Sequence, residues 1–147
     1  MIMMFLRPIH LILLLILITP SAHAGGSIMS PEQAHRAIKD GTLTLIDVRS
    51  PAEWRRTGLA KGAVPITMHN KKGMNAFLRE ILNHLKGDQS KPIAMICATG
   101  VRSHFIRQFL ALNGFSNVSE VPVGMLGRTN EPGWIAQGLP VEPCPNC

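Results

Sequence analysis

The chain has 147 residues, with 15 Lys and Arg against 9 Asp and Glu and a formal net charge of +6. This length suits one compact domain and leaves little room for a second. The basic residues are scattered, no aromatic residues alternate with them and Tyr is absent, so the composition argues against a nucleic-acid interface and favours a surface that attracts small anions.

The N-terminal segment is typical of an export signal. Arg7 precedes an apolar run at residues 11–18, and small residues ending at Ala24 match what a signal peptidase reads. Because the run is shorter than the roughly 20 apolar residues that span a bilayer, we expect residues 1–24 to be a cleaved signal peptide. A permanent anchor is the alternative. The mature protein would start near Gly25, in the periplasm or secreted, and would meet a membrane only before cleavage.

Helices and strands alternate along residues 25–142, where we expect a single domain. Two short helices begin with the same capping signature, a serine followed by proline, with Gln33 or Glu53 three residues after the serine. The predicted elements in chain order are helix 31–39, strand 43–48, helix 51–57, a short strand at 63–66, helix 74–85, strand 92–96, a helix from about 103 to 112 and strand 118–121.

The alternation predicts an α/β fold, a three-layer sandwich whose mainly parallel sheet is flanked by helices. Strand 92–96 is almost wholly apolar, as expected of a central strand that is covered on both faces. Ligand sites in such sheets lie at the carboxyl ends of the strands. The sequence therefore directs attention to the residues that follow strand 92–96.

Cys97 comes directly after that strand and shortly before a helix. Unpaired N–H groups at a helix N-terminus and the charge of Arg102 favour the thiolate over the thiol. Gly100 permits a turn in which backbone N–H groups point toward the sulfur as an anion nest. The simpler alternative is that Cys97 is a small core residue. The glycine, the arginine and the helix-start Ser103 favour a reactive thiol.

Four segments in the expected order resemble the motifs of the rhodanese-like family. Residues 97–103 are similar to its active-site loop, residues 45–49 with Glu53 and Trp54 to its first motif, residues 58–65 to its second and residues 133–142 to its C-terminal signature. The resemblance covers nearly all of the chain after residue 24 and implies the rhodanese-like fold.

The resemblance implies a sulfurtransferase in which Cys97 is the catalytic nucleophile. Its thiolate would take the outer sulfur of a small anionic donor such as thiosulfate and pass it, as a persulfide, to a thiol or cyanide. No metal and no organic cofactor is implied, and the histidines after residue 24 show no paired ligand spacing. The implied substrate-binding residues are the rest of the loop, Ala98, Thr99, Gly100, Val101, Arg102 and Ser103.

Asp47 and Arg49 end their strand near the expected site. They could support the Cys97 loop from behind, but we favour slightly a structural ion pair, for example between Arg49 and Glu53. Trp54 and Trp134 are expected to be packing anchors rather than substrate contacts.

Two features extend or depart from the family pattern. Ala98 and Thr99 stand where thiosulfate-preferring relatives often carry a basic residue, so the physiological donor stays open.

The tail at residues 143–147 contains Cys144 and Cys147, which we expect to form a disulfide because the cysteine count is odd and the compartment is oxidising. A zinc site is the weaker alternative. In another alternative the tail thiols accept sulfur from Cys97.

Two other functions compete with sulfur transfer. A cysteine phosphatase of related fold needs a loop one residue longer than the one between Cys97 and Arg102. A non-enzymatic sulfur carrier or binding module stays open, because sequence alone does not separate it from an enzyme.

Overall fold

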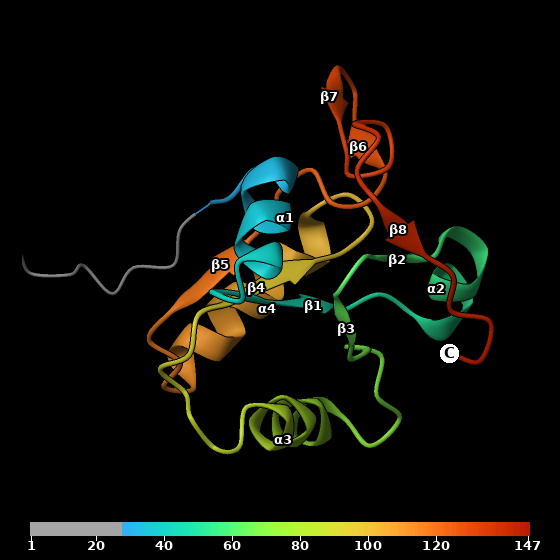
Figure 1. Cartoon of the computed structure of the whole chain (residues 1–147). Helices are drawn as coiled ribbons and strands as arrows, with labels where there is room; N and C mark the ends of the chain where they lie inside the picture. Colours follow the sequence, from blue (N-terminus) through green and yellow to red (C-terminus); the bar gives the residue numbers. More distant parts are fainter. Residues whose placement is uncertain (1–27) are drawn as a thin grey trace, which may run out of the picture.

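Four parallel strands form the centre of the fold, in the order β3-β1-β4-β5 (Figure 1). They are β1 (Thr44–Asp47), β3 (Val64–Pro65), β4 (Ile93–Ile96) and β5 (Val118–Glu120). This computed structural model describes residues 28–147, so the predicted signal peptide lies outside the described residues. Among residues 28–147, no helix combines the length and apolar character that a bilayer crossing requires.

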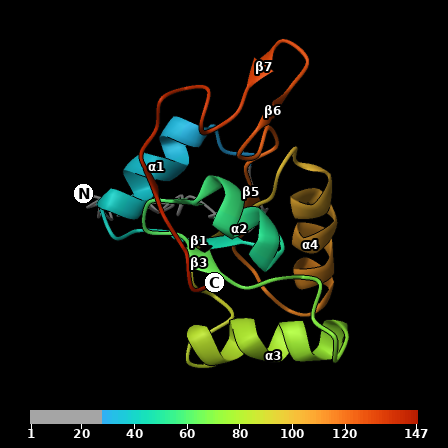
Figure 2. The same cartoon turned by 90° about the vertical axis from the view of Figure 1, so that its right-hand side faces the viewer.

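The helices cover both faces of this sheet. They are α1 (Pro31–Lys39), α2 (Pro51–Thr57), α3 (Met74–His84) and α4 (Val101–Leu112). Figures 1 and 2 show α1 and α3 on opposite sides of the sheet. Side chains of α3 and α4, such as Phe77 and Ile106, form one core with strand residues, and Ala34 of α1 and Trp134 contribute to a second. The predicted three-layer α/β fold with a parallel sheet is confirmed.

Two short antiparallel ladders complete the structure. One pairs β2 (Leu59–Ala60) with β8 (Val141–Glu142), and the other pairs β6 (Gly127–Arg128) with β7 (Glu131–Pro132). These ladders could not be predicted from the sequence, because strands of two residues are too short to show a periodic pattern.

Matching capping boxes start α1 and α2. In α1, the N–H of Gln33 donates to Ser30 Oγ at 3.2 Å, and the N–H of Ser30 donates to the Gln33 side chain at 2.8 Å. Ser50 and Glu53 repeat both bonds in α2, at 3.4 and 2.9 Å. Each box satisfies N–H groups that a helix N-terminus otherwise leaves without acceptors.

Candidate active site around Cys97

Cys97 lies at the carboxyl edge of the sheet, one residue after β4. Its side chain belongs to the core between the sheet and helices α3 and α4 and is 1% exposed. The N–H of Gly100 donates to Cys97 Sγ at 3.0 Å, and Ser103 Oγ lies 3.6 Å from the same sulfur. The sulfur therefore sits inside the loop that leads into α4.

Gly100 makes this loop possible. Its φ of +92° is left-handed, and it caps α4 without a side chain. A Cβ at this position would lie 1.7 Å from the carbonyl oxygen of Pro122, so no other residue fits the turn as built. Helix α4 consequently begins at Val101, two residues before the predicted start at Ser103.

The segment after β5 fixes the carbonyl groups of the loop. The N–H of Met125 donates to the Cys97 carbonyl at 2.8 Å, and the N–H of Leu126 donates to the Ala98 carbonyl at 2.9 Å. Arg128 Nε donates to the Thr99 carbonyl at 2.8 Å. With these carbonyls bonded to the segment after β5, the loop directs the N–H of Gly100, at the start of α4, toward the sulfur.

Arg102 forms a two-pronged ion pair with Glu53 of α2. Its Nη1 donates to Glu53 Oε2 at 2.8 Å and its Nη2 donates to Glu53 Oε1. Hydrogen bonding to Arg102, set against partial burial, lowers the pKa of Glu53 to about 2. The same pair raises the pKa of Arg102 above its ordinary value, with a smaller contribution from Cys97. His69 Nε2 lies 3.3 Å from Arg102 Nη1 on the exposed side.

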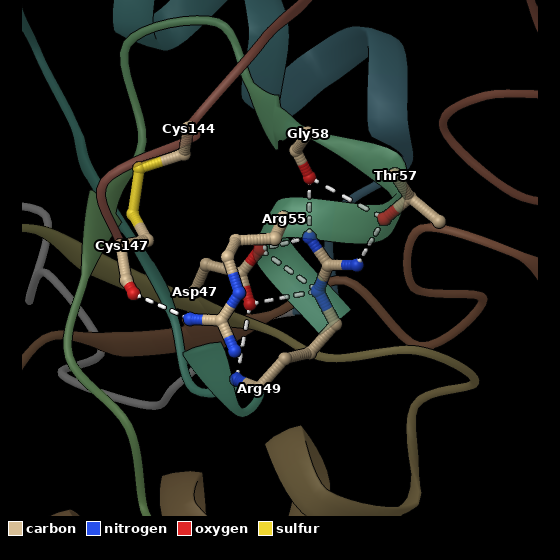
Figure 3. Close-up of a disulfide and its surroundings, with 7 residues drawn as sticks. All are labelled: Asp47, Arg49, Arg55, Thr57, Gly58, Cys144 and Cys147. Carbon is tan, nitrogen blue, oxygen red and sulfur yellow. Dashed lines mark hydrogen bonds and ion pairs between the residues drawn. A yellow bond between two sulfur atoms is a disulfide. The ribbon is translucent and has the colours of Figure 1, made fainter. Parts of the chain in front are cut away.

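Asp47 and Arg49 form a buried ion pair, with exposures of 0% and 1%. Figure 3 shows the guanidinium of Arg49 holding both carboxylate oxygens of Asp47, and it also donates to Thr57 Oγ1 and the Gly58 carbonyl at 2.7 Å each. The suggested pairing of Arg49 with Glu53 is wrong, because Arg49 points into the protein while Glu53 turns toward Arg102. Within residues 28–147, no hydrogen bond joins the side chains of Asp47 and Arg49 to residues 97–103, although the charge of Asp47 contributes to the raised pKa of Arg102.

The C-terminal tail lies beside α2 (Figure 3). A disulfide joins Cys144 to Cys147, and Cys97 is the free cysteine. Arg55 Nη1 donates to the Cys147 carbonyl at 2.7 Å. The strand before the tail, β8, pairs with β2, which follows α2 directly. The tail is thus attached to the protein at two places along α2 and β2.

The remaining residues of the predicted site and the two tryptophans differ in how far they are buried. In the loop, Ser103 is buried, whereas Val101 is 71% exposed beside the site. Both tryptophans are buried, in agreement with a packing role, and His35 packs edge-on against Trp134. Within residues 28–147, no three side chains of the metal-binding types gather into a group that could hold an ion.

Two contributors to the site do not follow from the sequence pattern. Glu53 was identified as a helix cap and a motif residue but not as the partner of Arg102. The segment that holds the loop, residues 124–128, was not identified at all. The sequence shows only a glycine there, Gly124. In the structure a Cβ at this position would lie 2.5 Å from the carbonyl oxygens of Cys97 and Ala98, so the close contact requires glycine.

Comparison with known proteins agrees with this geometry. Residues 30–129 match the family model described as "Rhodanese-like domain". The chain is 32% identical over 114 residues to a protein named thiosulfate sulfurtransferase GlpE from Actinobacillus pleuropneumoniae serotype 3, covering 78% of this chain and 91% of that protein. It is 29% identical over 109 residues to a tRNA uridine(34) hydroxylase of Legionella pneumophila, covering 74% of this chain but only 41% of that protein.

Solved structures show the same fold. A rhodanese-related protein from Thermoplasma volcanium is 28% identical with a TM-score of 0.56, over 79% of this chain and 97% of that one. The rhodanese-like domain of an Anabaena protein is 20% identical with a TM-score of 0.61, over 80% of each chain. By its sequence match and its fold, the chain belongs to the rhodanese-like domain family.

Proposed function

We propose that this protein is a sulfurtransferase in which Cys97 carries the transferred sulfur. One observation carries the proposal: Cys97 Sγ accepts the Gly100 N–H at 3.0 Å inside a loop that opens a helix. A persulfide is an anion, and N–H groups directed at a buried sulfur stabilise negative charge there. The similarity to a protein named thiosulfate sulfurtransferase supports the same activity.

The chemistry needs two displacement steps. In the first, the Cys97 thiolate forms a bond to the outer sulfur of thiosulfate, and the sulfur–sulfur bond of thiosulfate breaks so that its electron pair leaves with sulfite. In the second, cyanide or a thiolate attacks the outer sulfur of the persulfide and releases the Cys97 thiolate. Both are covalent catalysis, with the loop N–H groups holding the charge.

Mass spectrometry of the purified protein tests this proposal. Thiosulfate should add one sulfur atom at Cys97, and cyanide should then remove it and yield thiocyanate. Cys97→Ser should lose both reactions while keeping its fold. The matched control is the double variant Cys144→Ser with Cys147→Ser, which keeps Cys97 and should transfer sulfur at nearly the wild-type rate.

Other outcomes would redirect the proposal. A sulfur atom that loads onto Cys97 but is not released to any acceptor would indicate a carrier rather than an enzyme. A loss of transfer to dithiol acceptors in the control variant would make the tail cysteines part of the reaction. Transfer that persists in Cys97→Ser would contradict the mechanism.

We also propose that the protein is exported and cleaved after Ala24. The support is the sequence of residues 1–24. N-terminal sequencing of the protein isolated from its native cells should begin at or near Gly25, and a sequence that begins at Met1 would instead favour a permanent anchor.

A further inference from the structure

The carboxylate of Glu53 makes contacts to two different elements. Its Oε2 accepts the N–H and the Oγ–H of Ser50 at 2.9 Å each, which caps α2. The same carboxylate receives both Nη groups of Arg102, at the start of α4. Glu53 is 17% exposed and Arg102 is 25% exposed, so the pair lies at the surface of the Cys97 loop, partly shielded from water.

Capping a helix does not require the negative charge of Glu53. Gln33 occupies the same place in α1 and makes the same bond to the N–H of its serine, at 2.8 Å. A neutral amide therefore suffices for the cap. What the carboxylate adds in α2 is charge and a second acceptor oxygen, and both are used on Arg102.

This ion pair reduces the positive charge and the number of free N–H groups with which Arg102 could bind an anionic substrate. The negative charge of Glu53 offsets the positive charge of the guanidinium beside the loop. The two forked N–H groups that would otherwise bind an oxyanion are occupied, and His69 lies against Nη1 as well. Ala98 and Thr99 add no basic side chain to the loop.

We propose that Glu53 is a specificity-determining residue, which neutralises Arg102 and thereby turns the site from dianionic sulfur donors toward donors that carry a single negative charge. The proposal rests on the sulfurtransferase function proposed above. It names a preferred substrate class, singly charged sulfane-sulfur donors such as organic thiosulfonates, ahead of thiosulfate.

Two donors that differ by one charge test this proposal directly. Thiosulfate is a dianion, and methanethiosulfonate replaces one of its charged oxygens by a methyl group. With either donor, the Cys97 thiolate bonds to the outer sulfur, the sulfur–sulfur bond of the donor breaks, and its electron pair leaves with sulfite or methanesulfinate. The measured quantity is the ratio of kcat/KM for thiosulfate to kcat/KM for methanethiosulfonate, with cyanide as acceptor.

The ratio should follow the summed charge of residues 53 and 102. Coulomb energy is proportional to donor charge, so Glu53→Gln should raise kcat/KM about tenfold for the dianion and about threefold for the monoanion. The ratio thus rises about threefold in Glu53→Gln and falls about threefold in Arg102→Gln. The double variant should return to the wild-type ratio. A general loss of Cys97 reactivity cancels, because both donors react at the same sulfur.

A matched control separates this local effect from a change in net charge. Glu32→Gln removes one negative charge from the first turn of α1 and should leave the ratio unchanged. Circular dichroism and thermal melting verify folding, and Glu53→Gln keeps the capping bonds that Gln33 makes in α1. The Arg102→Gln variant keeps the test decisive if Glu53→Gln fails to fold.

Three results would overturn the inference. A ratio that is the same in all four proteins means that the charges of residues 53 and 102 do not select the donor. A ratio that falls in Glu53→Gln, as in Arg102→Gln, makes Glu53 an anchor for an arginine that binds the dianion. If wild-type Cys97 gains sulfur from neither donor, the proposed function fails and this inference fails with it.

Discussion

Helices α1 and α2 begin with the same chemistry but take part in different structures. Each is capped by a serine and by the side chain three residues later, Gln33 in α1 and Glu53 in α2. In the described part of α1, the side-chain hydrogen bonds of the cap stay within residues 30–33. In α2 the capping carboxylate also reaches Arg102, 49 residues further along the chain.

The other ends of the two helices differ as well. Helix α1 ends at exposed residues near Asp40, whereas Thr57 and Gly58 at the end of α2 accept hydrogen bonds from the buried Arg49. Local capping rules set where both helices start. Long-range contacts at both ends are what connect α2 to the carboxyl edge of the sheet, where the site lies.

The largest loss of stability should come from breaking the buried ion pair between Asp47 and Arg49, which also holds the end of α2. Arg49→Met leaves the carboxylate of Asp47 buried without its partner and should cost about 3–5 kcal/mol of unfolding free energy. The matched change in α1, Lys39→Met, alters an exposed side chain and should stay within about 0.5 kcal/mol. Urea denaturation measures both, and equal effects would contradict the difference between the two helix ends.

Substitutions of the capping residues Gln33 and Glu53 should differ in their cost to the free energy of unfolding. Gln33→Ala removes only a cap and should cost about 1 kcal/mol. Glu53→Ala removes a cap and an ion pair that is partly shielded from water, so we expect about 2 kcal/mol. Chemical denaturation of both variants gives the comparison, and a cost for Glu53→Ala no larger than that for Gln33→Ala would show that the pair with Arg102 adds no stability.

Acid should weaken α2 through Glu53. Its pKa is about 2 in the folded protein, below the ordinary 4.5, so folding favours the ionised form. That contribution is fully present above about pH 5 and is lost as pH falls toward the folded pKa. The difference in unfolding free energy between wild type and Glu53→Gln should therefore be constant near neutral pH and shrink toward pH 2. A difference that does not change with pH would contradict the pairing.

The smallest change in stability should come from placing in α1 the capping glutamate that α2 has. Gln33→Glu places a negative charge at a helix N-terminus, where the dipole favours it, and should change stability by no more than about 0.5 kcal/mol. Sulfur transfer should not change, because no arginine of α4 is hydrogen-bonded to Gln33 among the described residues. A large change in transfer would show that the charge acts from a distance rather than through Arg102.

Much of the scaffold could be predicted from local sequence. Caps and apolar spacing predicted the four helices of residues 28–147, and the apolar run before Cys97 predicted the central strand with the thiol at its end. The start of α4 was predicted late because serine is a common helix-start residue, whereas the structure uses the left-handed Gly100 in that place.

The contacts that complete the site could not be predicted from local sequence. Arg49 and Glu53 are close in sequence and opposite in charge, which favoured a pair between them. In the structure Arg49 follows β1 and is buried against Asp47, whereas Glu53 of α2 pairs with Arg102. The partner of Glu53 and the segment that holds residues 97–100 are both far along the chain. Only the packing of α4 and β5 brings them together.

The bonds between residues 97–100 and residues 124–128 also bear on the order of folding. The loop carbonyls bond to residues that follow β5, so these bonds require α4 to be in place and β5 to be paired with β4. Closing contacts over such a separation is slower than forming a helix, because chain entropy is lost before the contacts form. We therefore expect a refolding chain to gain its helical signal first and a correctly shaped Cys97 loop last.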